Sequence, residues 1–137
     1  MKQTIEKLAS LERDIATEKG EFSLFGAFFR EEAEDKWDLL VSASWLDTNK
    51  RESLEYLVNQ LRPRLDMQEL LSLSRIVLLE KDNPVLEAIH SEVRVRHGMA
   101  EIKDSTFSGI PIKHAFVITS EKDNSTASAK GVELRGA

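Results

Sequence analysis

The fold is decided by EFSLFGAFF at residues 21–29 and KWDLLVSASW at residues 36–45. The first segment has apolar side chains at odd and even positions alike, so a strand there is apolar on both faces and both need cover. The second segment alternates between a polar file with Asp38, Ser42 and Ser44 and a file of apolar side chains: Trp37, Leu39, Val41, Ala43 and Trp45. The period of two in both segments, joined by a polar connection, predicts a long antiparallel hairpin.

Helical periodicity precedes and follows this hairpin. The segment before it carries an apolar stripe that includes Glu12 and ends at Gly20. After the hairpin, Asn49 and Glu52 have the spacing of a helix N-cap pair, and the helix that they open is ended by Pro63. The sequence therefore predicts a helix on each side of the hairpin.

The remaining elements alternate between the two periods. Asp66 and Glu69 repeat the capping spacing and open a short helix. Residues 75–79 form an apolar run after Arg75 that is typical of a central strand, and Asn83-Pro84 starts a helix for which Gly98 is a C-cap candidate. The alternative to a helix that continues to Gly98 is that its last turn is extended. Strands are predicted at 99–103 and 112–119.

These elements predict an α+β fold with a mixed, largely antiparallel sheet of about five strands and three main helices. The predicted order is α-β-β-α-β-α-β-β, with the last strand among the best buried. Residues 1–120 form a single domain in this interpretation. Residues 121–137 have the small polar composition of a flexible tail.

Composition excludes several classes of function. The 137 residues include no cysteine, which rules out disulfides, thiolate zinc sites, iron–sulfur clusters and cysteine nucleophiles, and favours a cytoplasmic location. The net charge of -5 is concentrated in residues 21–47, which carry seven acidic and two basic side chains. Basic residues elsewhere are interleaved with acids, so nucleic-acid binding is not expected. The apolar runs are too short to span a membrane.

Residues 24–41 contain the most suggestive motif, Leu-Phe-Gly-Ala followed by Lys-Trp-Asp-Leu-Leu-Val. It resembles the signature of the minimal nucleotidyltransferase fold, in which a strand ends in Leu-Phe-Gly-Ser and the next reads Asp-x-Asp-Leu-Leu-Val. The resemblance implies a site where two aspartates share Mg²⁺ ions on the nucleotide phosphates. Here Asp38 matches, but Lys36 replaces the first metal-binding aspartate and Ala27 replaces the serine. The resemblance therefore implies a degenerate site, and we expect no metal and no cofactor.

The strongest polar constellation is Asp38, Ser42 and Ser44 on one strand face, opposite Arg75. A network that satisfies buried polar groups explains it equally well. An acidic cluster in the connection is predicted to be a solvated turn rather than a cation site: Glu31, Glu32, Glu34 and Asp35. The histidines His90, His97 and His114 are predicted to be surface or hydrogen-bonded residues rather than metal ligands.

The hairpin holds six of the nine aromatic residues: Phe22, Phe25, Phe28, Phe29, Trp37 and Trp45. Such density predicts a contact surface for a protein partner or a second copy, unless the chain covers both sheet faces itself. We therefore predict a non-enzymatic protein that acts through protein–protein interaction, as a homodimer or with a partner. The nucleotidyltransferase fold that the motif resembles includes antitoxin-type members. The resemblance therefore implies that this protein could be the antitoxin of a toxin–antitoxin pair. The alternative is a nucleotide-binding protein, or a Mg-dependent nucleotidyltransferase-like enzyme with a degenerate site.

Overall fold

The computed structural model describes residues 2–29, 36–107 and 109–122, which form a five-stranded sheet in the order β3-β2-β1-β5-β4. β2 and β3 run parallel, and the other neighbouring strands are antiparallel. The strands are β1 Leu24–Phe29, β2 Trp37–Ser42, β3 Leu73–Leu78, β4 Ala100–Phe107 and β5 Ile110–Ser120. The helices are α1 Lys2–Lys19, α2 Lys50–Leu61, α3 Met67–Ser72 and α4 Pro84–Glu92, with a 3-10 turn η1 Ser44–Asp47. The predicted α+β class with a mixed, mostly antiparallel sheet is confirmed.

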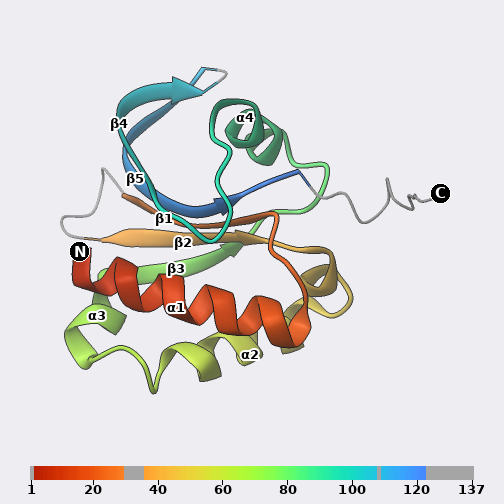
Figure 1. The fold of residues 1–137 in the computed structure, drawn as a ribbon, viewed down its shortest axis with the longest axis vertical. Helices are drawn as coiled ribbons and strands as arrows, with labels where there is room; N and C mark the ends of the chain where they lie inside the picture. Colours follow the sequence, from red (N-terminus) through yellow and green to blue (C-terminus); the bar gives the residue numbers. More distant parts are fainter. Residues whose placement is uncertain (1, 30–35, 108, 123–137) are drawn as a thin grey trace.

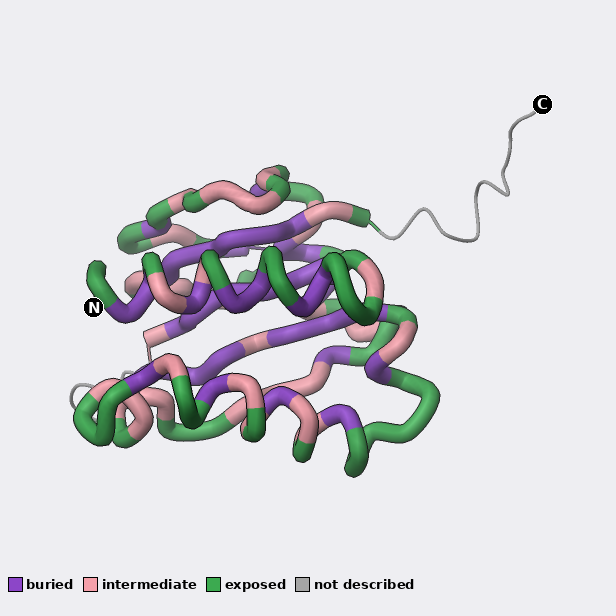
Figure 2. The backbone as a smooth tube through the Cα atoms, turned by 60° about the horizontal axis from the view of Figure 1, so that its bottom comes forward, coloured by how far each residue is buried: buried purple, intermediate pink, exposed green. Residues whose placement is uncertain are grey.

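The chain itself covers both faces of the sheet (Figure 1). α1, α2 and α3 lie on one face, and α4 lies on the other beside the bent β4–β5 hairpin. Phe25 belongs to the core cluster that includes Ile5 of α1, whereas Phe28 belongs to the cluster that includes Ile89 of α4. Figure 2 shows how buried residues recur along α1 and through the central strands. The two apolar faces of β1 therefore lie in two separate cores.

This cover corrects the predicted aromatic contact surface. Phe22, Phe25, Phe28 and Trp37 keep 7% or less of their surface exposed. Phe29 and Trp45 are half-buried and pack against the α1 core. The periodicity shows that both faces of the hairpin need cover, but it does not show that α4 and the β4–β5 hairpin supply the second layer. These four buried side chains are not available to a partner of the folded chain.

The ends of the second strand and of α4 differ from the prediction, and the last three strands differ from their predicted bounds by a few residues. The second strand ends at Ser42, and Trp45 lies in η1, where its indole Nε1 donates a hydrogen bond to the carbonyl of Gly20 at 3.0 Å. α4 ends at Glu92, well before Gly98, because the following chain turns extended and pairs with the end of β5. The extended alternative for its last turn is therefore the correct one.

The run predicted as a central strand is β3, which lies at the edge of the described sheet. Its residues are half-buried or exposed, because β1 takes β5 and not β3 as its second neighbour. The acidic cluster at residues 31–35 lies outside the described residues. The same holds for all but the first two residues of the tail predicted at 121–137.

A bulge in β5 sets which side chains face which core. Phe25 pairs with Thr119 and Gly26 pairs with Val117, so β5 holds one extra residue opposite β1. Beyond the bulge, Thr119 shares the face of Phe25 toward α1, and Ser120 takes the face toward α4. Without the extra residue, the strict period of two would exchange the faces of these last two side chains.

The predicted helix caps at Asn49, Asp66 and Asn83 all form. At α3 the capping box also joins helices, because Glu69 accepts hydrogen bonds from Lys7 Nζ at 2.7 Å and from Thr4 Oγ1 at 3.1 Å. The Lys7 ammonium, followed by the Asp66 backbone N–H, holds the pKa of Glu69 below its ordinary value. α1 and α3 are therefore held together partly by an ionised carboxylate.

Glu69→Gln is expected to lower the free energy of unfolding by about 1–2 kcal/mol at pH 7. Because the folded-state pKa is the lower one, the stabilisation is complete above the unfolded pKa of about 4.3 and is lost as the pH falls through the folded value. The difference between the two proteins should therefore shrink on acidification. Urea unfolding at pH 7 and pH 3 measures it, with exposed Glu55→Gln as the control. A difference that does not change with pH would contradict the role of the ionised carboxylate.

Candidate functional site

The structure brings together Asp38 and Arg75, the pair singled out in the sequence. They face each other across the β2–β3 pairing, with Arg75 Nη2 at 3.1 Å from Asp38 Oδ2. Asp38 is buried, whereas the Arg75 side chain is mostly exposed at the sheet edge. The arrangement ties the edge strand to β2, as expected of an ion pair that neutralises a buried carboxylate.

The two serines of that constellation lie elsewhere. Ser42 is buried on the α4 side of the sheet, four residues and about 13 Å along β2 from Asp38. Ser44 is exposed in η1. Asp38, Ser42 and Ser44 therefore do not form one site, although Ser42 and Ser44 line a common cavity.

This cavity, with a volume of about 820 Å³, lies where β2 and β5 end, beside α4. Binding sites for small molecules and cofactors commonly measure about 300–1,000 Å³. Five serines line it: Ser23, Ser42, Ser44, Ser91 and Ser120. Its charged lining residues are Lys81, Arg94, Arg96, Lys122, Asp47, Glu87 and Glu121. The charged part of the lining thus comprises four cationic and three anionic side chains.

Ser23 joins the walls of the cavity. Its carbonyl accepts the backbone N–H of Glu121 at 2.9 Å and lies 2.8 Å from His90 Nε2. Its own N–H and hydroxyl both donate to the carbonyl of Ser42, at 2.7 and 3.1 Å. Because a carbonyl oxygen only accepts hydrogen bonds, His90 must carry a proton on Nε2. The imidazole is therefore held in one orientation against the cavity wall.

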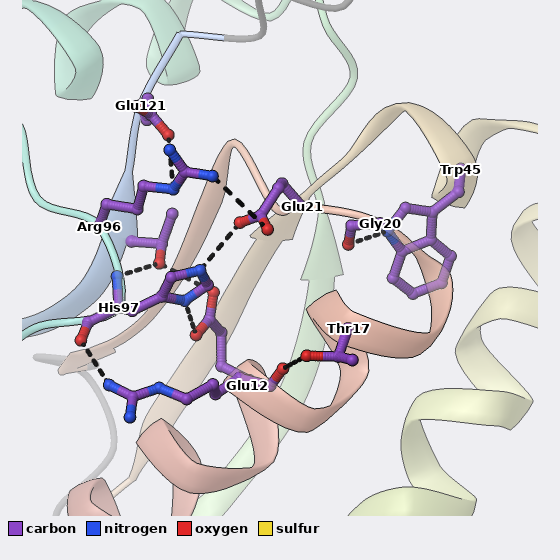
Figure 3. A network of polar contacts seen from close by, with 10 residues as sticks. Glu12, Thr17, Gly20, Glu21, Trp45, Arg96, His97 and Glu121 are labelled. Atoms are coloured by element: carbon purple, nitrogen blue, oxygen red, sulfur yellow. Dashed lines mark hydrogen bonds and ion pairs between the residues drawn. The ribbon is translucent and has the colours of Figure 1, made fainter.

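A network of charged side chains supports the wall formed by β5 and the chain before β4 (Figure 3). Arg96 lies between two carboxylates, with Nη2 3.6 Å from Glu21 Oε2 and Nε 3.6 Å from Glu121 Oε2. Glu21 also contacts His97, whose Nε2 lies 2.9 Å from Glu21 Oε1. Glu21 therefore has a second partner whatever the position of Arg96.

The opposite ring nitrogen of His97 reaches the core. Nδ1 lies 2.8 Å from Oε1 of Glu12, and the other oxygen of Glu12 accepts the Thr119 hydroxyl at 2.8 Å. Glu12 is completely buried. The sequence contained a signal for this group, since Glu12 stands within the apolar stripe of the first helix. Its partners, 85 and 107 residues further along the chain, follow only from the tertiary structure.

Within the described ranges, no three or more of the His, Asp and Glu side chains are placed to hold a metal ion. None of the helices described there is long and apolar enough to cross a membrane. Neither Asp38 nor Arg75 lines the cavity, so a ligand there would meet the serines, His90 and the surrounding charges instead.

Comparison of the chain with family models, with curated proteins and with solved structures found no match. The resemblance to the minimal nucleotidyltransferase fold therefore stays a prediction from residues 24–41.

Proposed function

We propose that the protein binds a small polar ligand with an anionic group, of nucleotide size, in the cavity between β2, β5 and α4. The observation that carries this proposal is the cavity lining. Three of its cations, Lys81, Arg94 and Lys122, have no carboxylate partner among the residues that the structure describes. Cations without partners beside hydroxyl groups suit phosphate or carboxylate oxygens. This proposal stays closest to the nucleotide-binding alternative, without a catalytic metal.

Thermal-shift screening with nucleotides, sugar phosphates and small carboxylates tests the proposal. A ligand at one hundred times its Kd is expected to stabilise the native protein by about 2.7 kcal/mol. The double variant Arg94→Ser/Lys122→Ser, at two exposed cavity positions, is expected to lose most of that shift.

The matched control is Arg51→Ser/Arg62→Ser, which removes two exposed cations, in α2 and at its C-cap, that do not line the cavity. It should keep the shift of the native protein. No stabilisation by any anionic compound, or equal stabilisation of the native protein and the cavity variant, would overturn the proposal.

We propose self-association as a second function, at a different surface from the aromatic hairpin. Met67 and Leu71, one helical turn apart on α3, are 71% and 60% exposed. Large exposed apolar side chains that share a helix face favour contact with another protein. The alternative partner for this face is a toxin, as the resemblance to antitoxin-type members implies, and a small adjacent toxin-like gene would support that pairing instead.

The native chain is expected to be a dimer at tens of micromolar, and the variant Met67→Glu/Leu71→Glu is expected to be a monomer at the same concentration. Light scattering measures the mass, and Met99→Glu, which charges an exposed methionine outside α3, is the control. A monomeric native chain would remove the basis for self-association. A dimer that survives the double substitution would place the contact elsewhere.

A further inference from the structure

The backbone on both sides of Arg96, one of the cations of the cavity, is held by hydrogen bonds. Its neighbour Val95 exchanges two backbone hydrogen bonds with Ser120, at 3.1 and 2.7 Å. On its other side, the His97 N–H donates to Thr119 Oγ1 at 3.1 Å, and Arg13 donates to the His97 carbonyl at 3.2 Å. The base of the Arg96 side chain is therefore fixed on the cavity wall before any ligand arrives.

The guanidinium of Arg96, in contrast, is held loosely. Its two contacts, with Glu21 and Glu121, are both 3.6 Å long, and no hydrogen bond joins it to another described residue. More than half of the Arg96 side chain is exposed, and ion pairs of this kind contribute only about 0–1 kcal/mol. If Arg96 turned away, Glu21 would keep its contact with His97, and Glu121 is exposed enough to be hydrated. Turning the guanidinium toward a ligand therefore costs little.

A second observation is an unmet polar group elsewhere in the lining of the same cavity. The hydroxyl of Ser120, a cavity-lining residue, is buried and has no hydrogen-bond partner among the described residues. Ser120 pairs directly with Val95, the residue before Arg96. A buried hydroxyl without a partner is unfavourable, and an oxygen atom of a ligand or a bound water would relieve it.

We infer that Arg96 is the residue that recognises the anion, and that Glu21 and Glu121 compete with the ligand for it. This inference rests on the proposed function and adds the residue that recognises the anionic group and the carboxylates that compete for it. The planar guanidinium presents paired N–H donors that match the oxygens of a carboxylate or a phosphate, whereas an ammonium group presents only a point charge. The ligand therefore carries one of these two groups, and its binding releases Arg96 from the carboxylates.

Titration of ¹⁵N-labelled protein with inorganic phosphate and, separately, with malonate tests the inference and distinguishes the two anions. Arg96→Gln is expected to weaken binding by at least about tenfold. Arg96→Lys, which keeps the charge, should weaken it nearly as much, because the paired donors are lost. Glu121→Gln is expected to tighten binding by about two- to fivefold.

Glu87→Gln is the matched control for Glu121→Gln, because Glu87 also lines the cavity but makes no ion pair with Arg96. Its effect should be smaller than that of Glu121→Gln. Binding by Arg96→Gln or Arg96→Lys at native strength would overturn the inference and leave the proposed function standing. Equal effects of the two glutamine substitutions would overturn the competition. Failure of the native protein to bind either anion or any other anionic compound would overturn the proposed function itself.

Discussion

Glu12→Ala is expected to lower the free energy of unfolding by about 3–5 kcal/mol, because it leaves two hydrogen-bonding groups without a partner and empties buried space. Glu12 is fully buried and accepts the Thr119 hydroxyl while it contacts His97. Its removal leaves that hydroxyl and that ring nitrogen without partners in the core, and it opens a cavity between α1 and β5. Whole domains are stable by only about 5–15 kcal/mol, so a large share of the stability depends on this carboxylate.

Urea unfolding measures this loss of stability, and two further variants serve as comparisons. Glu12→Gln keeps the shape and one acceptor oxygen, so it should cost less than Glu12→Ala and give a folded protein for comparison. Glu6→Ala, at an exposed position of the same helix, should change the stability by less than about 0.5 kcal/mol. A loss for Glu12→Ala no larger than that for Glu6→Ala would show that the network contributes nothing.

Gly26→Val is expected to destabilise the protein by about 3 kcal/mol, at the upper end of the usual cost of overpacking. A Cβ atom at Gly26 would lie 2.9 Å from the Phe116 carbonyl oxygen and 3.2 Å from Val117 Cα. Both atoms belong to the backbone of β5, next to the bulge, so β1 and β5 would have to separate. Gly26 belongs to the motif that resembles nucleotidyltransferases. In the present chain its structural role is to let β1 and β5 pack closely.

Gly98→Ala is the matched control for Gly26. A Cβ there would also meet an atom at 2.9 Å, but that atom is a side-chain methyl group of the half-buried Val95 and not the backbone of a paired strand. Gly98→Ala should therefore cost less than Gly26→Ala in thermal or urea unfolding. If the Gly26 variants are no less stable than Gly98→Ala, the β5 backbone yields more easily than the contact distances indicate.

Local signals predicted the elements of this fold well where neighbouring residues determine the structure. The cap pairs at Asn49 and Asp66 predicted helix starts because each side chain bonds a backbone N–H only a few residues away. Gly20, with φ of 125°, ends α1 because this backbone angle is one that residues with a Cβ rarely adopt. The period of two predicted β1 and β2 for a similar reason, since successive side chains of a strand point to opposite faces of the sheet.

Local sequence patterns predicted less of the candidate site than of the fold. The contact of Asp38 with Arg75 could be anticipated from their strands, but the cavity could not, because its walls come from four separate elements. His90 reaches the Ser23 carbonyl across 67 residues of sequence. No local pattern encodes such a meeting, since it depends on where α4 packs on the sheet.

The sequence by itself determined the elements, the α+β class and the need to cover both faces of the hairpin, because hydrophobic period and capping act within a few residues. Only the tertiary structure decided which elements cover the hairpin and which strand lies at the edge of the sheet. It also decided toward which face of the sheet the last side chains of β5 point. The physical reason is that strand order and the bulge are set by packing between segments far apart in the chain. One extra residue in β5 directs Thr119 to the buried carboxylate of Glu12 and Ser120 to the cavity beside α4.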